Sequence, residues 1–147
     1  MAHEDAGHYA GKHPQGTIAD PHIEKAVKTS ASGSNITCSA ATQISKELHV
    51  PMAKVGQTID LLEFRITHCQ LGLYGYGTPG DHGKNIATID NVSPLLKKEI
   101  ETALIDGRLH CKVAKEIADR LSVKKTEVTA ACDLLKIKIK FCELGAF

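Results

Sequence analysis

Apolar side chains recur at helical spacing along most of the chain, and short polar turns separate these stretches. In the C-terminal half, Ser93 precedes a proline and a run of apolar residues, which predicts a helix that begins there and ends at residues 106–107. The stretch Arg108–Cys111 is short enough for one strand, and two more helices follow, separated by a turn at residues 122–125. Residues 136–141 alternate strictly between lysine and apolar side chains, which predicts a half-buried strand.

The N-terminal half shows the same order of elements. Ile23 and Val27 mark the inner side of a first helix, and Pro51 opens a third helix after a second amphipathic stretch. Residues 64–69 are predicted to form the closing strand. We therefore expect a mainly helical fold with small β elements, in which each half contains a helix, a short strand, two helices and a second strand.

The two halves form an internal repeat. When the sequence is shifted by 73 positions, residues 36–72 align with residues 109–145 without a gap, and thirteen of the 37 pairs are identical. A duplicated unit of about 60 residues has a thin core, so we expect the copies to pack together or the chain to form a homodimer.

The repeat divides the chain into four predicted segments. The glycine-rich segment between the copies can turn sharply and approach a partner closely. The second copy ends without such a segment, so its last strand is expected to need a partner, such as the equivalent strand of a second subunit. The segments are a histidine-containing arm (1–19), a first repeat (20–75), a glycine-rich wing or linker (76–92) and a second repeat (93–147).

The order of the helices and the spacing of their apolar residues resemble the winged helix-turn-helix superfamily. Two steeply crossing helices require a particular order of residues: a small residue, an apolar residue, a short turn with valine and a second apolar stripe. The resemblance implies two winged-helix-like units, each with its third helix as a recognition helix and with the next strand leading into a wing. Residues 85–89 are then a candidate return strand of the wing. The residues that carry the resemblance are Ala41, Ile44, Leu48, Val50, Val55, Ile59 and Leu62, then Ala114, Ile117, Leu121, Val123, Val128, Cys132 and Leu135.

A recognition helix would contact double-stranded DNA through its outward side chains. Lysine and glutamine reach base edges, and threonine and lysine contact phosphates. Neither third helix contains arginine, the commonest base reader, so docking of a protein partner remains the alternative. Glu127, Thr129 and Ala130 are also predicted to face outward. The candidate DNA-binding residues are Lys54, Gln57, Thr58, Lys84, Lys124, Lys125, Thr126 and Lys138.

Composition and charge narrow the classes of partner. The net charge is +1 at pH 7, aromatic residues make up 4% of the chain, and tryptophan is absent, which leaves few stacking platforms for single-stranded nucleic acid. Residues 93–147 hold eleven basic and eight acidic residues, so the C-terminal third is the best candidate for a polyanion contact. Because the sequence contains no long apolar run and no secretory signal, we expect a cytoplasmic protein without membrane contact.

Four of the five cysteines form two repeat-matched pairs, Cys38 with Cys69 and Cys111 with Cys142. In the winged arrangement the first and last strands of a unit share a sheet, so each pair would permit a redox pair or half of a metal or iron–sulfur site. There is no CxxC motif, and buried cysteine is a common core residue, so the core interpretation is favoured. Cys132 lies on an apolar stripe and is predicted to be core.

Histidines cluster in the N-terminal arm. His3, His8 and His13 are candidate metal ligands, although their spacing of five fits no helix face and no standard site. The segment around them is irregular, which predicts either a disordered arm or a strap that docks on a partner.

Two functional hypotheses follow from these features. The first is a DNA-binding transcriptional regulator with tandem winged-helix units that responds to redox state or to a metal through its cysteines. The second is a non-catalytic interaction or assembly subunit that uses the same units to dock a protein. No nucleophile–base pair and no pair of catalytic carboxylates can be assigned, so an enzyme is not expected. The absence of a cofactor is favoured over a metal ion or an iron–sulfur cluster.

Overall fold

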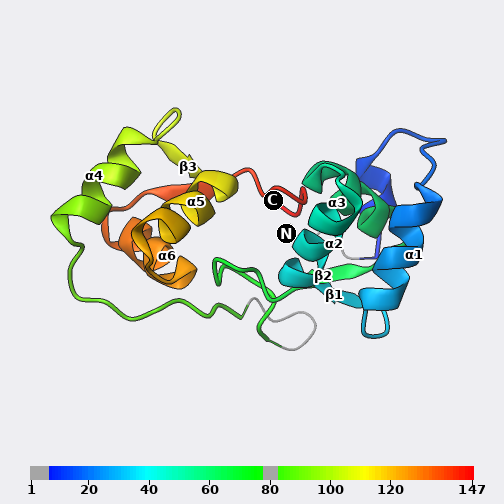
Figure 1. The fold of residues 1–147 in the computed structure, drawn as a ribbon, viewed down its shortest axis with the longest axis horizontal. Coiled ribbons are helices and arrows are strands. Elements are labelled where there is room, and N and C mark those ends of the chain that lie inside the picture. The colour runs from blue at the N-terminus through cyan, green and yellow to red at the C-terminus, as the bar shows by residue number, and fades with distance from the viewer. Residues whose placement is uncertain (1–6, 78–82) are drawn as a thin grey trace. The chain divides into compact units, whose positions relative to one another are not determined.

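The structure is a computed structural model, and it describes residues 7–77 and 83–147. It is mainly helical with small β elements, as the apolar pattern predicts (Figure 1). The first half contains the 3-10 helix η2 (Tyr9–Lys12), α1 (Pro21–Ser30), β1 (Asn35–Thr37), α2 (Cys38–Leu48), α3 (Met52–Leu61) and β2 (Arg65–Thr67). The second half contains α4 (Pro94–Thr102), β3 (Arg108–His110), α5 (Cys111–Leu121), α6 (Lys125–Leu134) and β4 (Lys138–Lys140).

The same frame of helices and strands occurs twice, at the offset of 73 residues seen in the sequence. β1, α2, α3 and β2 each begin and end 73 residues before β3, α5, α6 and β4, and α1 begins 73 residues before α4. Left-handed backbone recurs at the same offset, at His49 and Ser122 and at Glu63 and Lys136. These residues end helices or lead into strands, so the duplication extends to the turns.

Each half forms its own two-stranded parallel sheet. β1 pairs with β2, and β3 pairs with β4, with Thr37 opposite Thr67 and His110 opposite Lys140. The last strand of the second repeat therefore has its partner in the same repeat, and the expected need for a strand from a second subunit is corrected. A parallel pair requires a crossover connection, which the two helices between the strands supply.

The helix starts follow from local sequence. Asp20 caps α1 by accepting from the His22 and Ile23 amides, and Ser93 caps α4 by accepting from the Leu96 amide. Both helices then carry proline in the first turn. The apolar faces of the helices bury their side chains in the core; among them are Ile23, Val27, Ile44, Val55 and Ile59 in the first repeat and Leu96, Ile100, Ile117, Val128 and Cys132 in the second.

Several predicted boundaries and one predicted strand differ from the structure. α4 ends at Thr102 and not at residues 106–107, because Ile105 and Arg108 form a bridge around a turn in which Asp106 and Gly107 have positive φ. β4 is limited to residues 138–140 by positive φ at Lys136 and Phe141. Residues 85–89 form no strand; the Asn85 amide donates to the Gly72 carbonyl, and the segment runs alongside α6. The predicted wing strand is therefore wrong.

Two compact units make up the chain, and they do not coincide with the predicted segments. Unit 1 comprises Met1–Cys69 together with Glu143–Phe147, and unit 2 comprises Gln70–Cys142. The chain thus enters unit 2 at Gln70, shortly after β2, and returns to unit 1 at Glu143, shortly after β4. The last five residues are therefore part of the folded unit 1 and not only a tail.

Candidate functional site

The outer face of α6, which the winged-helix resemblance assigns to DNA, is covered by other parts of unit 2. Thr129 Oγ1 donates to the Leu71 carbonyl at 2.7 Å, and Thr129 is completely buried. A Cβ on Gly72 would lie 3.2 Å from Thr126 Cγ2. Residues 86–89 line a shallow pocket together with Ala130, Asp133 and Leu134. Thr129 and Ala130 are therefore buried and not outward-facing, because residues 71–72 and 86–89 lie over this face.

The outer face of α3 is covered in the same way within unit 1. A Cβ on Gly56 would lie 1.9 Å from the Leu144 carbonyl oxygen, so the backbone of Leu144 passes directly over the helix. Thr58 is 2% exposed and donates to the Lys54 carbonyl, which corrects its predicted outward position. α3 also packs against α1, α2 and η2, so little of its surface is left for a groove of DNA.

The remaining candidate DNA-binding residues are scattered over different elements. Lys125 is half-buried and pairs with Asp119 at 3.4 Å, and Gln57 and Thr126 are also half-buried. Lys125 and Thr126 thus lie beside a face of α6 that residues 71–72 and 86–89 cover. The exposed candidates are Lys54, Lys84, Lys124 and Lys138.

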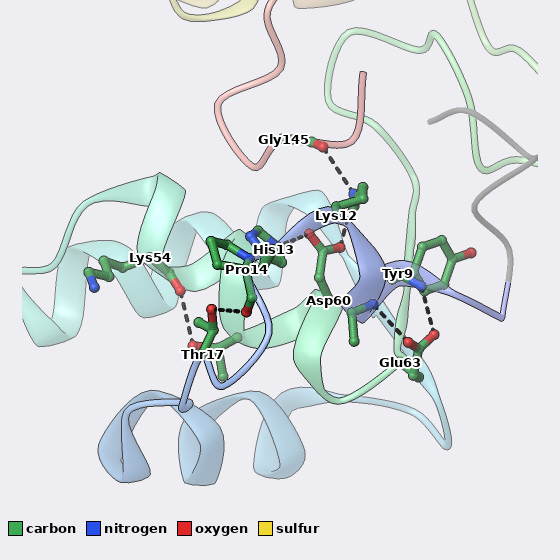
Figure 2. A network of polar contacts seen from close by, with 11 residues as sticks. Tyr9, Lys12, His13, Pro14, Thr17, Lys54, Asp60, Glu63 and Gly145 are labelled. Carbon is green, nitrogen blue, oxygen red and sulfur yellow. Dashed lines mark hydrogen bonds and ion pairs between the residues drawn. The ribbon is translucent and has the colours of Figure 1, made fainter.

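The N-terminal arm docks on α3 through a polar cluster (Figure 2). His13 Nε2 lies 2.7 Å from Asp60 Oδ2, and Lys12 Nζ lies 3.1 Å from Asp60 Oδ1. The Lys12 ammonium also donates to the Gly145 carbonyl at 3.1 Å, which joins the arm to the C-terminal segment. The backbone amides of Tyr9 and Ala10 donate to the Glu63 carboxylate at 2.9 and 2.7 Å. Residues 9–13 of the arm thus dock within their own chain.

Asp60 is the centre of this cluster. The residue is 3% exposed, and burial raises the pKa of its carboxyl above the ordinary value of 3.8, while the hydrogen bonds from His13 and Lys12 act in the opposite direction. A buried carboxylate is tolerated where cations and hydrogen-bond donors surround it. The cluster therefore anchors the arm, and nothing in it points to chemistry on a substrate.

The candidate metal ligands are not gathered into a site. His13 is paired with Asp60, His8 is exposed, and His3 lies outside the described residues. None of the five cysteines, all of which are described, forms a disulfide; Cys38, Cys69, Cys111 and Cys132 are buried, and Cys142 is half-buried. Burial and the neighbouring Asp133 raise the pKa of the Cys132 thiol to about 12. Among residues 7–77 and 83–147, no group of three or more His, Cys, Asp or Glu side chains is placed to hold a metal ion.

A cationic surface lies on the outward side of the β3–β4 sheet. Parallel pairing places Arg108 beside Lys138 and His110 beside Lys140, while Leu109 between them is completely buried. Neighbouring strands are about 4.8 Å apart and alternate residues along a strand about 6.6 Å apart, so these four side chains form one compact group. We call this group, Arg108, His110, Lys138 and Lys140, the basic face. Within the described parts of the chain, no carboxylate pairs with its three permanent cations.

An exposed aromatic ring borders the basic face. Phe141 follows β4 directly, is 60% exposed and has a φ of 57°, a left-handed conformation that turns the chain at the end of the strand. Its ring contacts the His110 ring, with the two centroids 4.6 Å apart and the planes inclined by 48°. A bulky apolar ring in solvent, supported from one side by an imidazole, is thus adjacent to three cations.

Unit 1 lacks this combination at the equivalent positions. The β1–β2 sheet carries Asn35 beside Arg65 and Thr37 beside Thr67, so it has one cation where unit 2 has three. Thr37 also caps α2 by accepting from the Ala40 amide, whereas its counterpart His110 makes no side-chain cap bond at α5. The first amides of α5 therefore add partial positive charge next to the basic face.

Sequence reasoning found Lys138 but missed the other members of the basic face, and it missed Asp60 and Glu63 as anchors of the arm. The alternation of lysine and apolar residues in 136–141 was the signal from which the row of lysines on this strand could have been found. The pairing of β4 with β3, which adds Arg108 and His110, becomes visible only in the folded chain.

No described helix has both the length and the apolar character needed to cross a bilayer. No protein-family model matches the chain, and no curated protein and no solved structure matches it.

Proposed function

We propose that the chain is a non-catalytic nucleic-acid-binding module, and that the basic face of unit 2 contacts the phosphate backbone. The observation that carries this proposal is the close grouping of Arg108, Lys138 and Lys140 without a carboxylate partner in the described residues. Like charges side by side on a sheet repel one another, and a polyanion relieves that repulsion. Arginine and lysine are also the principal phosphate contacts of nucleic-acid-binding proteins.

The distribution of charge between the units agrees with this proposal. Unit 2 holds twelve basic and nine acidic residues, whereas unit 1 holds six basic and eight acidic residues. The net charges of +3 and −2 would direct a polyanion to unit 2. The covered outer faces of α3 and α6 favour contact with the backbone over base reading by a recognition helix.

The test is a titration of labelled oligonucleotides by fluorescence anisotropy across a salt series. The triple variant Arg108→Ala/Lys138→Ala/Lys140→Ala is expected to bind at least about tenfold more weakly, and its salt slope on duplex DNA should fall by about 0.9 for each lost phosphate contact. The matched control Lys84→Ala/Lys98→Ala/Lys124→Ala removes the same charge from the linker, α4 and the turn before α6. It is expected to change affinity about threefold or less.

Two results would overturn the proposal. In the first, the wild-type chain binds no oligonucleotide at low salt. In the second, the control variant loses binding while the basic-face variant keeps it, which would return the contact to the helix-turn segments that include Lys84 and Lys124.

A second candidate function is protein assembly, and the way in which α3 and α6 are covered favours it. Each of these helices already holds a peptide segment with the sequence Leu-Gly, namely Leu144–Gly145 on α3 and Leu71–Gly72 on α6. A surface that holds such a segment in one chain can hold the same segment from a second copy, which would give a homodimer. Light scattering across a hundredfold concentration range tests this, and a constant monomer mass would exclude it.

A further inference from the structure

We propose that the basic face and Phe141 together form a site for single-stranded nucleic acid, in which one base stacks on the Phe141 ring. This inference rests on the proposed function, because it takes the basic face as the backbone contact and adds the group that selects the strand type. It depends on three observations in unit 2: the exposure of Phe141, its support by His110, and the cations beside it.

The exposure of Phe141 is built into the backbone. A φ of 57° at a bulky residue is unfavourable, and the equivalent residue in unit 1, His68, has a φ of 50° and is also exposed. The frame therefore directs the residue after the last strand into solvent in both units. In unit 2 that residue is phenylalanine, whose exposure to water is unfavourable and whose ring offers a flat apolar surface to a partner.

The support from His110 leaves most of the Phe141 ring available. The rings touch at a tilt of 48°, and the phenylalanine is still 60% exposed. Any nucleobase can stack on such a ring, because every base presents a π face. The bases of a duplex are already stacked inside the double helix, so they cannot use the ring without being extruded, and extrusion costs free energy.

The cations beside the ring are placed to contact successive phosphates of a single nucleic-acid strand. Lys140 precedes Phe141 directly, Lys138 lies two residues earlier on the same side of β4, and Arg108 lies beside Lys138 on β3. A backbone that runs along this short sheet would meet three cations while its base reaches the ring. Proteins that bind single strands without sequence preference combine a cationic track with an aromatic platform in this way.

The experiment uses the full chain and short homopolymers, dT12 and U12, with a duplex of equal length as the comparison. Phe141→Leu keeps apolar bulk at an exposed position and is expected to weaken binding of both single strands about tenfold while duplex affinity changes about twofold or less. Phe147→Leu, which removes a phenylalanine from unit 1, is the control and should bind like the wild-type chain. Because dT12 and U12 differ in the 2′-hydroxyl and in the base methyl group, a large difference in affinity between them would show that more than stacking selects the strand.

A second variant reports stacking directly. The chain contains no tryptophan, so Phe141→Trp introduces a single fluorophore at the proposed platform. It is expected to retain single-strand affinity and to lose fluorescence when dT12 binds, while the duplex of equal length leaves the emission unchanged.

The outcomes separate this inference from the proposed function. If the basic-face variant loses binding but Phe141→Leu does not, the backbone contact stands and the stacking site is wrong. Unquenched emission from the Phe141→Trp variant with bound dT12 would lead to the same conclusion. If the wild-type chain prefers duplex over single strands at equal salt, the strand selectivity is excluded. If no oligonucleotide binds, both proposals fail.

Discussion

Asp60 in unit 1 and Asp133 in unit 2 occupy equivalent positions near the ends of α3 and α6, yet Asp60 is buried and Asp133 is exposed. In unit 1 the arm supplies Lys12 and His13 to the carboxylate. In unit 2 the equivalent residues of the linker are Asn85 and Ile86, which cannot form an ion pair with it. The same aspartate is thus an anchor in one unit and a surface residue in the other.

A second difference runs in the opposite direction. At the sheets, unit 1 carries threonines and one arginine, whereas unit 2 carries three cations, a histidine and an exposed phenylalanine. The two units therefore differ in where their distinctive polar side chains lie: where the arm docks in unit 1 and on the sheet in unit 2. A repeated fold preserves the positions of side chains, and the chemistry at each position is free to diverge.

The largest expected effect comes from filling the space over α3. Gly56→Ala would place a Cβ 1.9 Å from the Leu144 carbonyl oxygen, so the C-terminal segment has to shift away. We expect the free energy of unfolding, measured with urea, to fall by about 2–3 kcal/mol. Gly11→Ala is the control, because a Cβ there meets nothing within 4 Å. Equal unfolding midpoints for the two variants would contradict the docking of residues 143–147 on α3.

The next effect concerns the corresponding contact on α6. Thr129→Val keeps the side-chain shape but removes the 2.7 Å bond to the Leu71 carbonyl, which is left buried without that donor. The expected loss of stability is about 1–2 kcal/mol. Thr102→Val, at an exposed position of α4, should change stability by less than about 0.5 kcal/mol. If both variants unfold at the same urea concentration, residues 71–72 are not held on α6 as described.

The next test exchanges the capping of two equivalent helices: it removes the cap of α2 and adds one to α5. Thr37→Ala removes the cap of α2 and should lower the free energy of unfolding by about 1 kcal/mol. His110→Thr places a capping residue at the start of α5, where none acts now, and should raise it by about 0.5 kcal/mol. Thermal unfolding of the two variants measures both changes. A stability change of the same sign in both would show that the two helix starts do not differ in capping.

The smallest expected effect is a pH dependence confined to unit 1. Because burial raises the pKa of Asp60 above 3.8, the folded chain retains a proton that the unfolded chain has already released. The free energy of unfolding of the wild type, minus that of Asp60→Asn, should therefore fall as the pH rises from about 4 through the raised pKa. Urea unfolding at several pH values measures this slope, with Asp133→Asn as the variant at the equivalent position. A rising difference would mean that the ion pairs with Lys12 and His13 outweigh desolvation.

Much of the fold could be predicted from the sequence. The order of elements and the helix starts at Ser93 and Pro51 depend on residues close together in the chain. The burial of Cys132 follows from its place on an apolar stripe. The candidate site was predicted less well: Lys138 is part of the basic face, but Thr58 is buried and Lys125 is paired with Asp119.

The helical frame and its repetition follow from the order of the residues alone, because apolar spacing and capping act over a few residues and the repeat is carried by the residues themselves. Long-range contacts, in contrast, select the segment that covers α3 or α6 and the strand residues that lie side by side. Residues 71–72 and 144–145 have the same Leu-Gly sequence, so nothing local assigns either one to a particular helix. The parallel pairing that brings Arg108 to Lys138 joins residues 30 positions apart, and such contacts form only when the core between them is assembled.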